Sequence, residues 1–521
     1  MNRRDLLLLF LLGLIVPLIV AHFQPYPGYL DADYYFAGGL QLAQGKGFTE
    51  PYLWNYLDDP QTLPHPSHTY WMPLASLLTA LGMWLTAQTT YASGRLLFLW
   101  IAALIPPLTA ALAFTFSHRR ALALTSGLLA VFPVFHLPFM SVPDNFGTFM
   151  LLGGLYFLLF PREDTPPWRF ALLGLLAGFF TLGRNDGLLW LALTFLVALW
   201  VARRRPSLGR KISSFLAFSL FALIGFLLVM APWYARNFSI YASLMPPGTS
   251  RTLWLTHYDE TFIYPARQLT LQHLLASGWA AILKVRLWAL NQNLQSGFAA
   301  HGAIILFPFI LVGAWVQRTD RRVRLAVLAW LILFFVMTVI FPFAGVRGAF
   351  FHAGAALQPL WWSLAPLGLE TTVAAARKRG WFTPQAFLIF RIVLVQIVIM
   401  LSIYVCWMRL FKLGWGEGEQ YYPAIEQRLQ TLGIQPGEPV MVLNPPAYYL
   451  TTGRPAIVQP YGEPQTILTV AQRFGVRFFV FESSGKLPPV SPLYENPQSF
   501  DHFRYLGELD GARIFQIQPT P

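Results

Sequence analysis

Long apolar runs, separated by short polar stretches, occupy most of the chain up to about residue 413. They lie at residues 5–21, 95–116, 121–137, 146–160, 170–183, 187–202, 213–232, 297–316, 325–342, 350–367 and 385–408. Runs of this length can cross a hydrocarbon core of about 30 Å when the helices tilt to suit. The pattern therefore predicts an α-helical polytopic membrane protein with about eleven transmembrane helices.

Basic residues mark alternate loops between these runs. They cluster at Arg3–Arg4, Arg119–Arg120, Arg162–Arg169, Arg203–Lys211, Arg318–Arg324 and Arg377–Arg379. Because cytoplasmic loops carry an excess of Lys and Arg, these loops are predicted to face the cytoplasm. The N-terminus is then cytoplasmic, and an odd number of crossings places the C-terminus outside the cell membrane. The first run lacks a small-residue cleavage site, so it is expected to remain as an anchor.

The composition is typical of a membrane protein and argues against a nucleic-acid partner. The chain is 55% hydrophobic and only 12% charged, whereas soluble proteins carry about 25% charged residues. A net charge of +13 would suggest a nucleic-acid partner in a soluble protein. Here the basic residues are explained by topology, so no nucleic acid is expected. The single cysteine, Cys406, excludes an intrachain disulfide.

Two external regions stand out from the apolar runs. The first external loop, about 22–94, contains an apolar helical stretch at 65–87, which is predicted to lie in the outer interface with Trp71, Trp84 and Tyr91 as anchors.

From Gly414 the composition becomes that of a soluble protein, and the periodicity there predicts helices over 421–434 and 463–475, strands over 439–444 and 476–483, and a hairpin about Asp510-Gly511. We therefore expect a transmembrane catalytic domain over 1–413 and a small extracytoplasmic α/β domain over 414–521.

Ionisable residues on the predicted outer face are the candidate functional groups. Such groups are costly beside a bilayer and mark a site by default. Asp31 and Asp33 are the catalytic candidates, because a carboxylate can act as a general base. Arginine binds phosphate bidentately, and the substrate-binding candidates are His65, His68, Asp144, Arg184, Asp186, Arg236, Arg347 and His352. No glycine-rich phosphate loop, zinc signature or nucleophile elbow is present, so neither a nucleotide site nor a metal site is assigned.

Each candidate also has a purely structural interpretation. Asp31 and Asp33 can be solvated loop residues, and Asp144, which follows a proline, can be a helix N-cap. The arginines can be interfacial anchors whose charged ends reach water. The two loop histidines, His65 and His68, can equally pack or cap the loop. The shared location of all these residues on one membrane face favours a site over these separate explanations.

Four stretches resemble a known family. They are DADYYFAGGLQLAQGKGF at 31–48, HTYWMPLASLLTALG at 68–82, TLGRNDGLLWLAL at 181–193 and APWYARNFSIYASLMP at 231–246. The first resembles the first-loop signature of the GT-C superfamily of integral membrane glycosyltransferases. The others are similar to stretches of its protein O-mannosyltransferase and aminoarabinose transferase branch. The resemblance covers about residues 1–370.

The resemblance implies a helix bundle whose first loop covers an outward-facing cavity. It implies transfer of a sugar from a polyprenyl-phosphate donor to a glycan, lipid or protein acceptor outside the cytoplasm. The reaction would be an inverting single displacement that requires no cofactor, although a divalent ion can assist. Residues two apart on a helix point about 200° from each other, so one of the two aspartates should face the cavity. The family spacing selects Asp31 as the general base.

The chain departs from the aminoarabinose branch at two positions. That branch has Asp-Glu where this chain has Asp31-Ala32, with the second acid displaced to Asp33. It has Lys-Pro-Pro-Leu where this chain has Trp71-Met72-Pro73-Leu74, so the lysine contact to the donor phosphate is absent. The phosphate partner must then be another residue, chosen from His65, His68, Arg184 and Arg347, and lipid A is a doubtful acceptor.

Two other functions compete with transfer. A transporter or flippase for lipid-linked sugars would also have many spans, but such proteins typically show internal repeats and polar residues at the membrane midplane. This sequence has no evident repeat, and its polar residues gather at one face. A non-enzymatic protein that displays the C-terminal domain would need neither so many spans nor external arginines. That domain is itself expected to lid the cavity or select the acceptor, with Tyr421, Tyr422, Tyr448 and Tyr449 as contacts.

Overall fold

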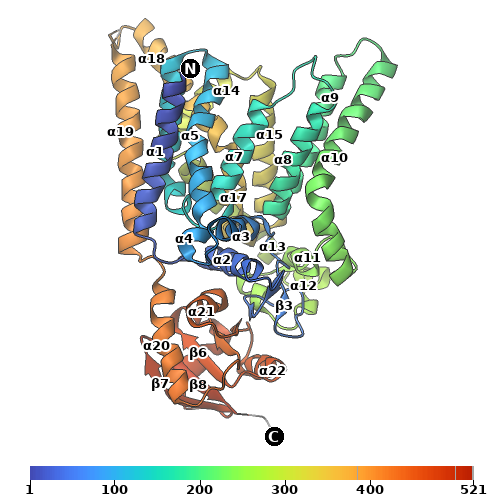
Figure 1. Cartoon of the computed structure of the whole chain (residues 1–521), viewed down its shortest axis with the longest axis vertical. Coiled ribbons are helices and arrows are strands. Elements are labelled where there is room, and N and C mark those ends of the chain that lie inside the picture. Colours follow the sequence, from blue (N-terminus) through green and yellow to red (C-terminus); the bar gives the residue numbers. More distant parts are fainter. Residues whose placement is uncertain (384, 499, 519–521) are drawn as a thin grey trace.

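The apolar runs form a bundle of helices that stands above a smaller extramembrane part (Figure 1). The computed structural model describes residues 1–383, 385–498 and 500–518. The main bundle helices are α1 (Arg3–His22), α5 (Leu96–Ser117), α6 (Arg120–Val131), α7 (Asn145–Leu158), α8 (Arg169–Gly183), α9 (Leu188–Ala202), α10 (Leu208–Tyr241), α14 (Phe307–Val316), α15 (Arg321–Phe335), α18 (Gln358–Lys378) and α19 (Ala386–Trp407).

Within the described residues, six helices are long and apolar enough to cross a membrane by length and composition. They are Arg3–His22, Tyr91–Ser117, Asn185–Ala202, Leu208–Tyr241, Arg321–Ile340 and Ala386–Lys412. Further apolar helices, among them α6, α7, α8 and α14, are shorter. The protein is therefore a multi-pass helical membrane protein, and the expected number of about eleven crossings stays a prediction.

The run expected as one span at 297–316 is interrupted. A π-helical turn, η6 (Gly297–His301), continues α13 (Trp279–Ser296), and the chain then turns before α14. Ala303 and Ile304 have positive φ values of 45° and 56° in that turn, which a continuous α-helix does not contain. Short irregular segments continue nearby and border the site described below: η7 (Val336–Ile340), α16 (Pro342–Ala344), η8 (Gly345–Ala349), α17 (Phe350–Gly354) and η9 (Ala355–Leu357).

Glycines allow the bundle helices to approach closely. A Cβ added at Gly174 of α8 would lie 1.8 Å from the carbonyl oxygen of Ala222 in α10, and one at Gly225 of α10 would lie 2.0 Å from that of Ala171. Such close backbone contact is how helices associate in lipid, where the hydrophobic effect between helices is weak.

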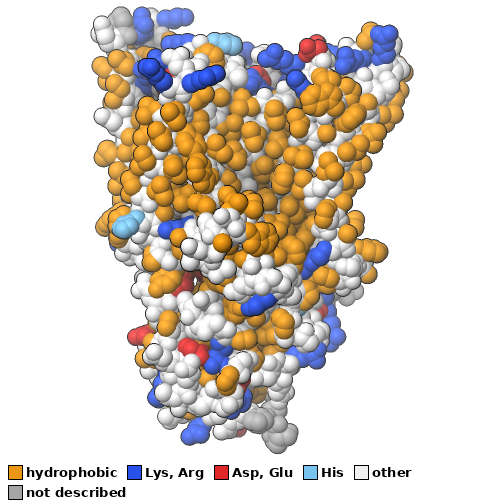
Figure 2. Space-filling view, in the orientation of Figure 1, with side chains coloured by type: hydrophobic (Ala, Val, Ile, Leu, Met, Phe, Trp, Pro, Cys, Tyr) orange, Lys and Arg blue, Asp and Glu red, His pale blue; other side chains and the backbone are white. Residues whose placement is uncertain are grey.

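The surface divides into bands along the long axis of the molecule. Hydrophobic side chains cover the bundle, and Lys and Arg gather at its upper edge, at the end that holds the N-terminus (Figures 1 and 2). The opposite end leads into the more polar extramembrane part (Figure 2). This distribution agrees with an apolar belt bounded by a basic face.

The first loop builds the junction between the bundle and the extramembrane part. Its helices α2 (Leu30–Ala43), α3 (Leu74–Thr86) and α4 (Tyr91–Gly94) lie beneath the bundle in Figure 1. α3 buries Ala75 and Met83 and exposes Trp84 and Leu85, and its location in the outer interface stays a prediction. After α10, the chain adds α11 (Pro247–Arg251), η3 (Thr252–Trp254), η4 (Tyr258–Phe262), η5 (Ala266–Gln268) and α12 (Leu271–Ala276) at the same end.

The C-terminal region folds around a six-stranded sheet. Its elements are α20 (Glu417–Thr431), β4 (Val440–Val442), α21 (Pro445–Thr452), β5 (Ala456–Val458), α22 (Pro464–Phe474), β6 (Phe478–Glu482), η11 (Ser483–Gly485), η12 (Pro488–Val490), α23 (Ser491–Glu495), β7 (Phe503–Leu509) and β8 (Ala512–Ile517). The strand order is β2-β5-β4-β6-β8-β7, with the first four parallel and β7–β8 forming the predicted hairpin. Positive φ at both Asp510 and Gly511 suits its two-residue turn.

One strand of this sheet comes from the first loop. β2 (Tyr52–Leu53) pairs in parallel with β5, with Tyr52 opposite Ala456 and Leu53 opposite Ile457. The other short strands of the loop, β1 (Thr49–Glu50) and β3 (His65–Pro66), pair with each other. The sheet therefore joins residues on both sides of position 414, and the C-terminal region is tied to the loop that carries Asp31 and Asp33.

Candidate active site

A cavity of about 180 Å³, lined by charged and aromatic side chains, lies where the first loop meets the irregular segments of the bundle. The cavity is lined by residues from α2, the turn between α8 and α9, the segment after α10, and η7 to α17. They include Asp31, Tyr35, Trp54, Tyr70, Trp71, Arg184, Asn185, Asp186, Thr249, Thr252, Tyr258, Phe341, Arg347 and His352. Five of the sequence-predicted site residues thus face one space, although they come from three distant parts of the chain.

Asp31 reaches the cavity from the first turn of α2. The helix begins after Tyr29, whose extended backbone serves as the N-cap, and an acidic residue is favourable in a first turn. The Asp31 side chain is half-buried. Burial, and then the negative charge of Asp144, raise the pKa of Asp31 to about 6. Such a carboxylate is still mostly ionised at neutral pH and is well matched to proton transfer.

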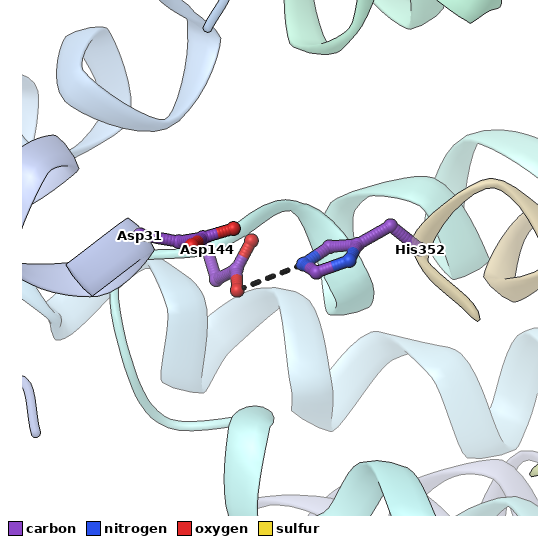
Figure 3. A group of neighbouring side chains, drawn as sticks. All are labelled: Asp31, Asp144 and His352. Carbon is purple, nitrogen blue, oxygen red and sulfur yellow. Dashed lines mark hydrogen bonds and ion pairs between the residues drawn. The ribbon is translucent and has the colours of Figure 1, made fainter. Parts of the chain in front are cut away.

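Asp144 and His352 lie beside Asp31 (Figure 3). Asp144 is the N-cap of α7 and accepts a hydrogen bond from the backbone N–H of Asn145. Its Oδ2 also accepts from the Tyr29 hydroxyl and lies 3.1 Å from Nε2 of His352. The structural interpretation of Asp144 as a cap is therefore correct, and the same carboxylate also contacts the cluster.

These three side chains form a group that can hold a metal ion. Each offers one ligand atom, and the atoms lie within 4.8 Å of one another. His352 Nδ1 lies 2.9 Å from the carbonyl oxygen of Gly348, an acceptor that requires Nδ1 to carry the proton. In a neutral ring Nε2 then presents a lone pair towards the Asp144 carboxylate, an arrangement that a bound cation or a protonated ring relieves. The donor set of two carboxylates and one imidazole suits a divalent transition ion.

The two cavity arginines differ in their partners. Arg184, at the end of α8, donates from Nε and Nη2 to Asp186, with the shortest contact at 2.8 Å. Arg347 lies over the ring of Tyr258, 4.3 Å from its centroid. Among residues 1–383, 385–498 and 500–518, no side-chain hydrogen bond or ion pair is formed by Arg347. Its guanidinium is therefore the cation most free to meet an anionic ligand in the cavity.

Asp33 points away from the cavity and into the junction with the C-terminal region. It is fully buried, and its Oδ2 accepts a hydrogen bond of 2.9 Å from the Asn444 side chain. Burial, and then the negative charge of Glu419, raise the pKa of Asp33 well above its ordinary value. Asp33 is enclosed and held by Asn444 away from the cavity, so its surroundings suit a structural role.

Three other candidates lie in the packing of the first loop. His65 forms ion pairs with Asp58 and Glu50, at 3.0 and 3.5 Å. His68 is buried between the hydroxyls of Ser67 and Ser76.

Arg236, the third of these candidates, donates to the backbone carbonyl of Ser67 at 2.8 Å and lies over the ring of Trp233. None of these three residues lines the cavity, and their contacts agree with the packing alternative.

Aromatic side chains form a cavity wall that the sequence did not reveal. Trp54 and Trp71 stack with ring centroids 4.0 Å apart and planes 11° apart, and Tyr35 and Tyr258 complete the wall. Trp71 was expected to anchor the loop in the interface, but it faces the cavity instead. Only the abundance of Trp and Tyr in the external loops could have suggested this wall, because no spacing rule connects residues from separate loops.

These features define a class: a polytopic membrane protein with a cavity of charged and aromatic side chains where its helix bundle meets its extramembrane part. No protein-family model and no curated protein sequence matches the chain. Solved structures do match. ArnT from Cupriavidus metallidurans in the apo state aligns with a TM-score of 0.52 and 14% identity, over 99% of each chain. The archaeal oligosaccharyltransferase AglB from Archaeoglobus fulgidus, in complex with an inhibitory peptide and a dolichol-phosphate, aligns with a TM-score of 0.50 and 13% identity, over 92% of this chain and 69% of that chain.

Both neighbours are membrane glycosyltransferases of the GT-C superfamily, and this chain has the GT-C fold. The resemblance carried by the first-loop signature is thereby confirmed at the level of fold. At identities this low the likeness concerns architecture alone, and activity has to be argued from the site itself.

Proposed function

We propose that the protein is a glycosyltransferase that moves a hexosyl or pentosyl group from a polyprenyl-phosphate donor to an extracytoplasmic acceptor. One observation carries this proposal: the carboxyl group of Asp31 and the guanidinium of Arg347, which forms no hydrogen bond or ion pair with any described residue, face the same cavity beside an apolar bundle. Those groups serve the two ends of the reaction, the acceptor proton and the donor phosphate. The neighbours with this fold support it, since one was solved with a dolichol-phosphate.

The cavity is proposed to open outside the cytoplasm. The basic edge of the bundle lies at the end opposite the extramembrane part (Figure 2), and positive charge marks the cytoplasmic side. A reporter fused after Arg379 should then read cytoplasmic, and one fused after Gly414 should read external. A cytoplasmic reading for the second fusion would contradict this orientation.

The reaction is proposed as a single displacement. Asp31 accepts the proton of the acceptor hydroxyl or amine, and the freed electron pair attacks the anomeric carbon. The bond between that carbon and the phosphate oxygen breaks, and its electrons leave with the lipid phosphate. Attack opposite to the leaving group inverts the anomeric centre. Arg347 stabilises the charge on the departing phosphate, and the donor's own phosphate ester makes a nucleotide unnecessary.

A divalent cation would be held by Asp31, Asp144 and His352, whose donor atoms fit one. When bound it would act as a Lewis acid that neutralises phosphate charge. Asp144 and Tyr29 keep the cluster in place through the hydrogen bond from the tyrosine hydroxyl. The aromatic wall of Trp54 and Trp71 offers the flat apolar surface on which a sugar ring or an aglycone can pack.

The C-terminal region is proposed to position the first loop and to shape the acceptor side of the cavity. Three of the four tyrosines that were expected to contact the acceptor instead bond to glutamates within the C-terminal region. Tyr421 and Tyr422 donate to the buried Glu482, and Tyr448 donates to Glu426. Tyr449 instead reaches the first loop, where its hydroxyl accepts from Gln41 at 2.7 Å.

The proposal is tested with the purified full-length protein in detergent, given a radiolabelled polyprenyl-phosphate sugar and envelope extracts as acceptors, with no nucleotide added. Transfer of label that depends on the donor supports the proposal. Mass measurement of the lipid that copurifies should identify the sugar. The competing flippase function predicts transbilayer movement of the donor in vesicles without any transfer, and that result would overturn the proposal.

A further inference from the structure

A second groove lies between α6 and α19, remote in sequence from the residues of the candidate active site. It has a volume of about 560 Å³ and is lined by Arg120, Ala121, Leu124, Thr125, Leu128, Arg391, Ile392, Val395 and Gln396. α19 stands at the edge of the bundle (Figure 1). The lining combines two arginines with a series of apolar side chains, so the groove has one charged end and an apolar length.

Arg391 is an ionisable residue inside an apolar helix. It lies five residues after the start of α19, which places it about 7.5 Å along the helix axis. The side chain is half-buried, and its recorded contact is with the ring of Phe387, 5.5 Å from the centroid. The described part of the chain offers it no hydrogen bond or ion pair. A charge at such a position is costly unless a partner meets it.

Gln396 is a second polar residue without a protein partner among the described residues, and it lies further along α19 than Arg391. Its exposed side chain lines the same groove as that of Arg391, although the two positions are about 140° apart around the helix, and its amide has no hydrogen-bond partner among the described residues. An unpaired amide in an apolar surrounding costs free energy. Two polar side chains without protein partners among the described residues, separated by about 7.5 Å along the helix axis and lining one groove, are consistent with a ligand that is polar at two successive depths.

Arg120 supplies the second cation at the charged end. It donates from Nε and Nη2 to the carboxylate of Asp5 in α1, both at 2.7 Å. The side chain remains 60% exposed, and Nη1 is not used in that pair. Asp5 neutralises one of the two positive charges, so the charged end of the groove keeps a net positive charge through Arg391.

We propose that this groove binds an anionic phospholipid of the leaflet at the basic end of the bundle. Arg391 and the free Nη1 of Arg120 bind the phosphate, and the Gln396 amide donates to an ester carbonyl, which lies just deeper than the phosphate. Leu124, Leu128 and Val395 provide the apolar wall for an acyl chain. Basic pockets between transmembrane helices recognise anionic headgroups in this way, whereas the cation of a zwitterionic headgroup would meet the positive end.

Native mass spectrometry of the full-length protein tests the proposal, with phosphatidylglycerol and phosphatidylcholine titrated separately. We expect tighter binding of phosphatidylglycerol, and an Arg391→Gln variant should weaken it about tenfold, the loss expected for one charge-assisted contact. Gln396→Leu, which favours the membrane-inserted helix, should weaken it less. Arg379→Gln removes a charge at the exposed end of α18 and serves as the matched control.

Further outcomes decide the source and the site of the bound lipid. Equal binding of the two lipids, or unchanged phosphatidylglycerol binding in Arg391→Gln, would overturn the proposal and leave Arg391 as a residue whose charge reaches water. Loss of phosphatidylglycerol in Arg347→Ala but not in Arg391→Gln would place the lipid in the active-site cavity and would also overturn it. Retention of polyprenyl-phosphate binding by Arg391→Gln would separate this groove from the donor site.

Discussion

Asp31 and Asp33 are two residues apart on α2, yet the fold gives them opposite surroundings. Asp31 faces the polar cavity beside Asp144 and His352. Asp33 is fully buried at the junction with the C-terminal region, where Asn444 donates to it. Burial raises the pKa of both carboxyl groups. The pKa of Asp31 is raised only to about 6, whereas the pKa of Asp33 is raised well above its ordinary value.

The comparison shows that two residues within one helical turn can have different roles, one facing the cavity and one holding the helix against the C-terminal region. Because the two residues lie about 200° apart around α2, one face of the helix presents the candidate base and the other contacts the C-terminal region. Gln41, further along α2, also joins the helix to the C-terminal region, since its side chain donates to Tyr449. The C-terminal region thus determines how α2 is held, and α2 in turn determines where Asp31 points.

The largest expected effect comes from removing the base. Asp31→Asn should leave folding intact, because the amide has the same shape, but should lower the transfer rate by about 10²–10⁴-fold, as is typical for loss of a general base. Asp33→Asn is the matched control and should have a much smaller effect, since Asp33 is buried at the junction and does not line the cavity. The measurement is transfer at saturating donor. An inactive Asp33→Asn with a normal Asp31→Asn would reverse the assignment.

The next largest effect is expected from the two cavity arginines, which are the candidate partners of the donor phosphate. Arg347→Ala should lower donor affinity about tenfold or more, because it removes a charge-assisted contact from the unpaired cation of the cavity. Arg184→Ala should do less, since Arg184 is already paired with Asp186. Titration calorimetry or a filter-binding assay with the lipid-linked donor gives the affinities. Unchanged binding in both single variants and in the double variant would exclude both residues.

A smaller effect is expected where α2 is fastened. Asn444→Ala leaves the buried Asp33 without its donor, so it should lower the free energy of unfolding by about 1–3 kcal/mol. The measurement is thermal unfolding of the full-length protein in detergent. Thr469→Ala, which removes an exposed hydroxyl in α22, is the control. A variant as stable as the control would show that the contact does not hold the junction.

The smallest expected effect concerns His65, which the fold places in the loop rather than in the cavity. Burial alone would lower its pKa, but hydrogen bonds to Asp58 and Glu50 outweigh burial and raise the pKa to about 9. Because the folded-state pKa lies above the ordinary value of about 6.5, the stabilisation is complete below that value and is lost as pH rises through 9.

The stability difference between wild type and His65→Gln should therefore shrink between pH 6.5 and 9.5, by on the order of 1 kcal/mol. Thermal unfolding at a series of pH values gives this difference. A constant difference across the range would show that His65 is not held in its charged form by Asp58 and Glu50.

Much of the architecture could be predicted from the local pattern of hydrophobic and polar residues. Hydropathy located the bundle helices, because a lipid-facing helix must be apolar over its length. The alternation and turn residues of the C-terminal region indicated α20, α22, β6 and the β7–β8 hairpin. The first-loop signature pointed to Asp31 and to the GT-C fold. Pattern did not reveal β5, which has only three residues, or α21, which opens with two prolines.

The contents of the cavity were decided by tertiary contacts. The sequence placed a set of ionisable residues on one membrane face. Nothing local distinguishes Arg347, whose guanidinium has no hydrogen-bond or ion-pair partner in the described part of the chain, from Arg236, which donates to backbone carbonyls. The same holds for His352 and His65, one beside the catalytic candidate and one in a loop ion pair. The partner of a side chain can lie hundreds of residues away in the sequence, and the local spacing of residues carries no information about such a contact.

The sequence by itself therefore determined the membrane class, the apolar helices and the identity of Asp31 as the best base candidate, since these depend on hydropathy, helical period and a local signature. The tertiary structure alone decided that β2 of the first loop joins the C-terminal sheet and that Asn444 meets Asp33. It also decided that Asp144 and His352, 208 positions apart, meet beside Asp31. The physical reason is that burial and pairing are properties of the packed chain, whereas period and hydropathy are properties of each segment.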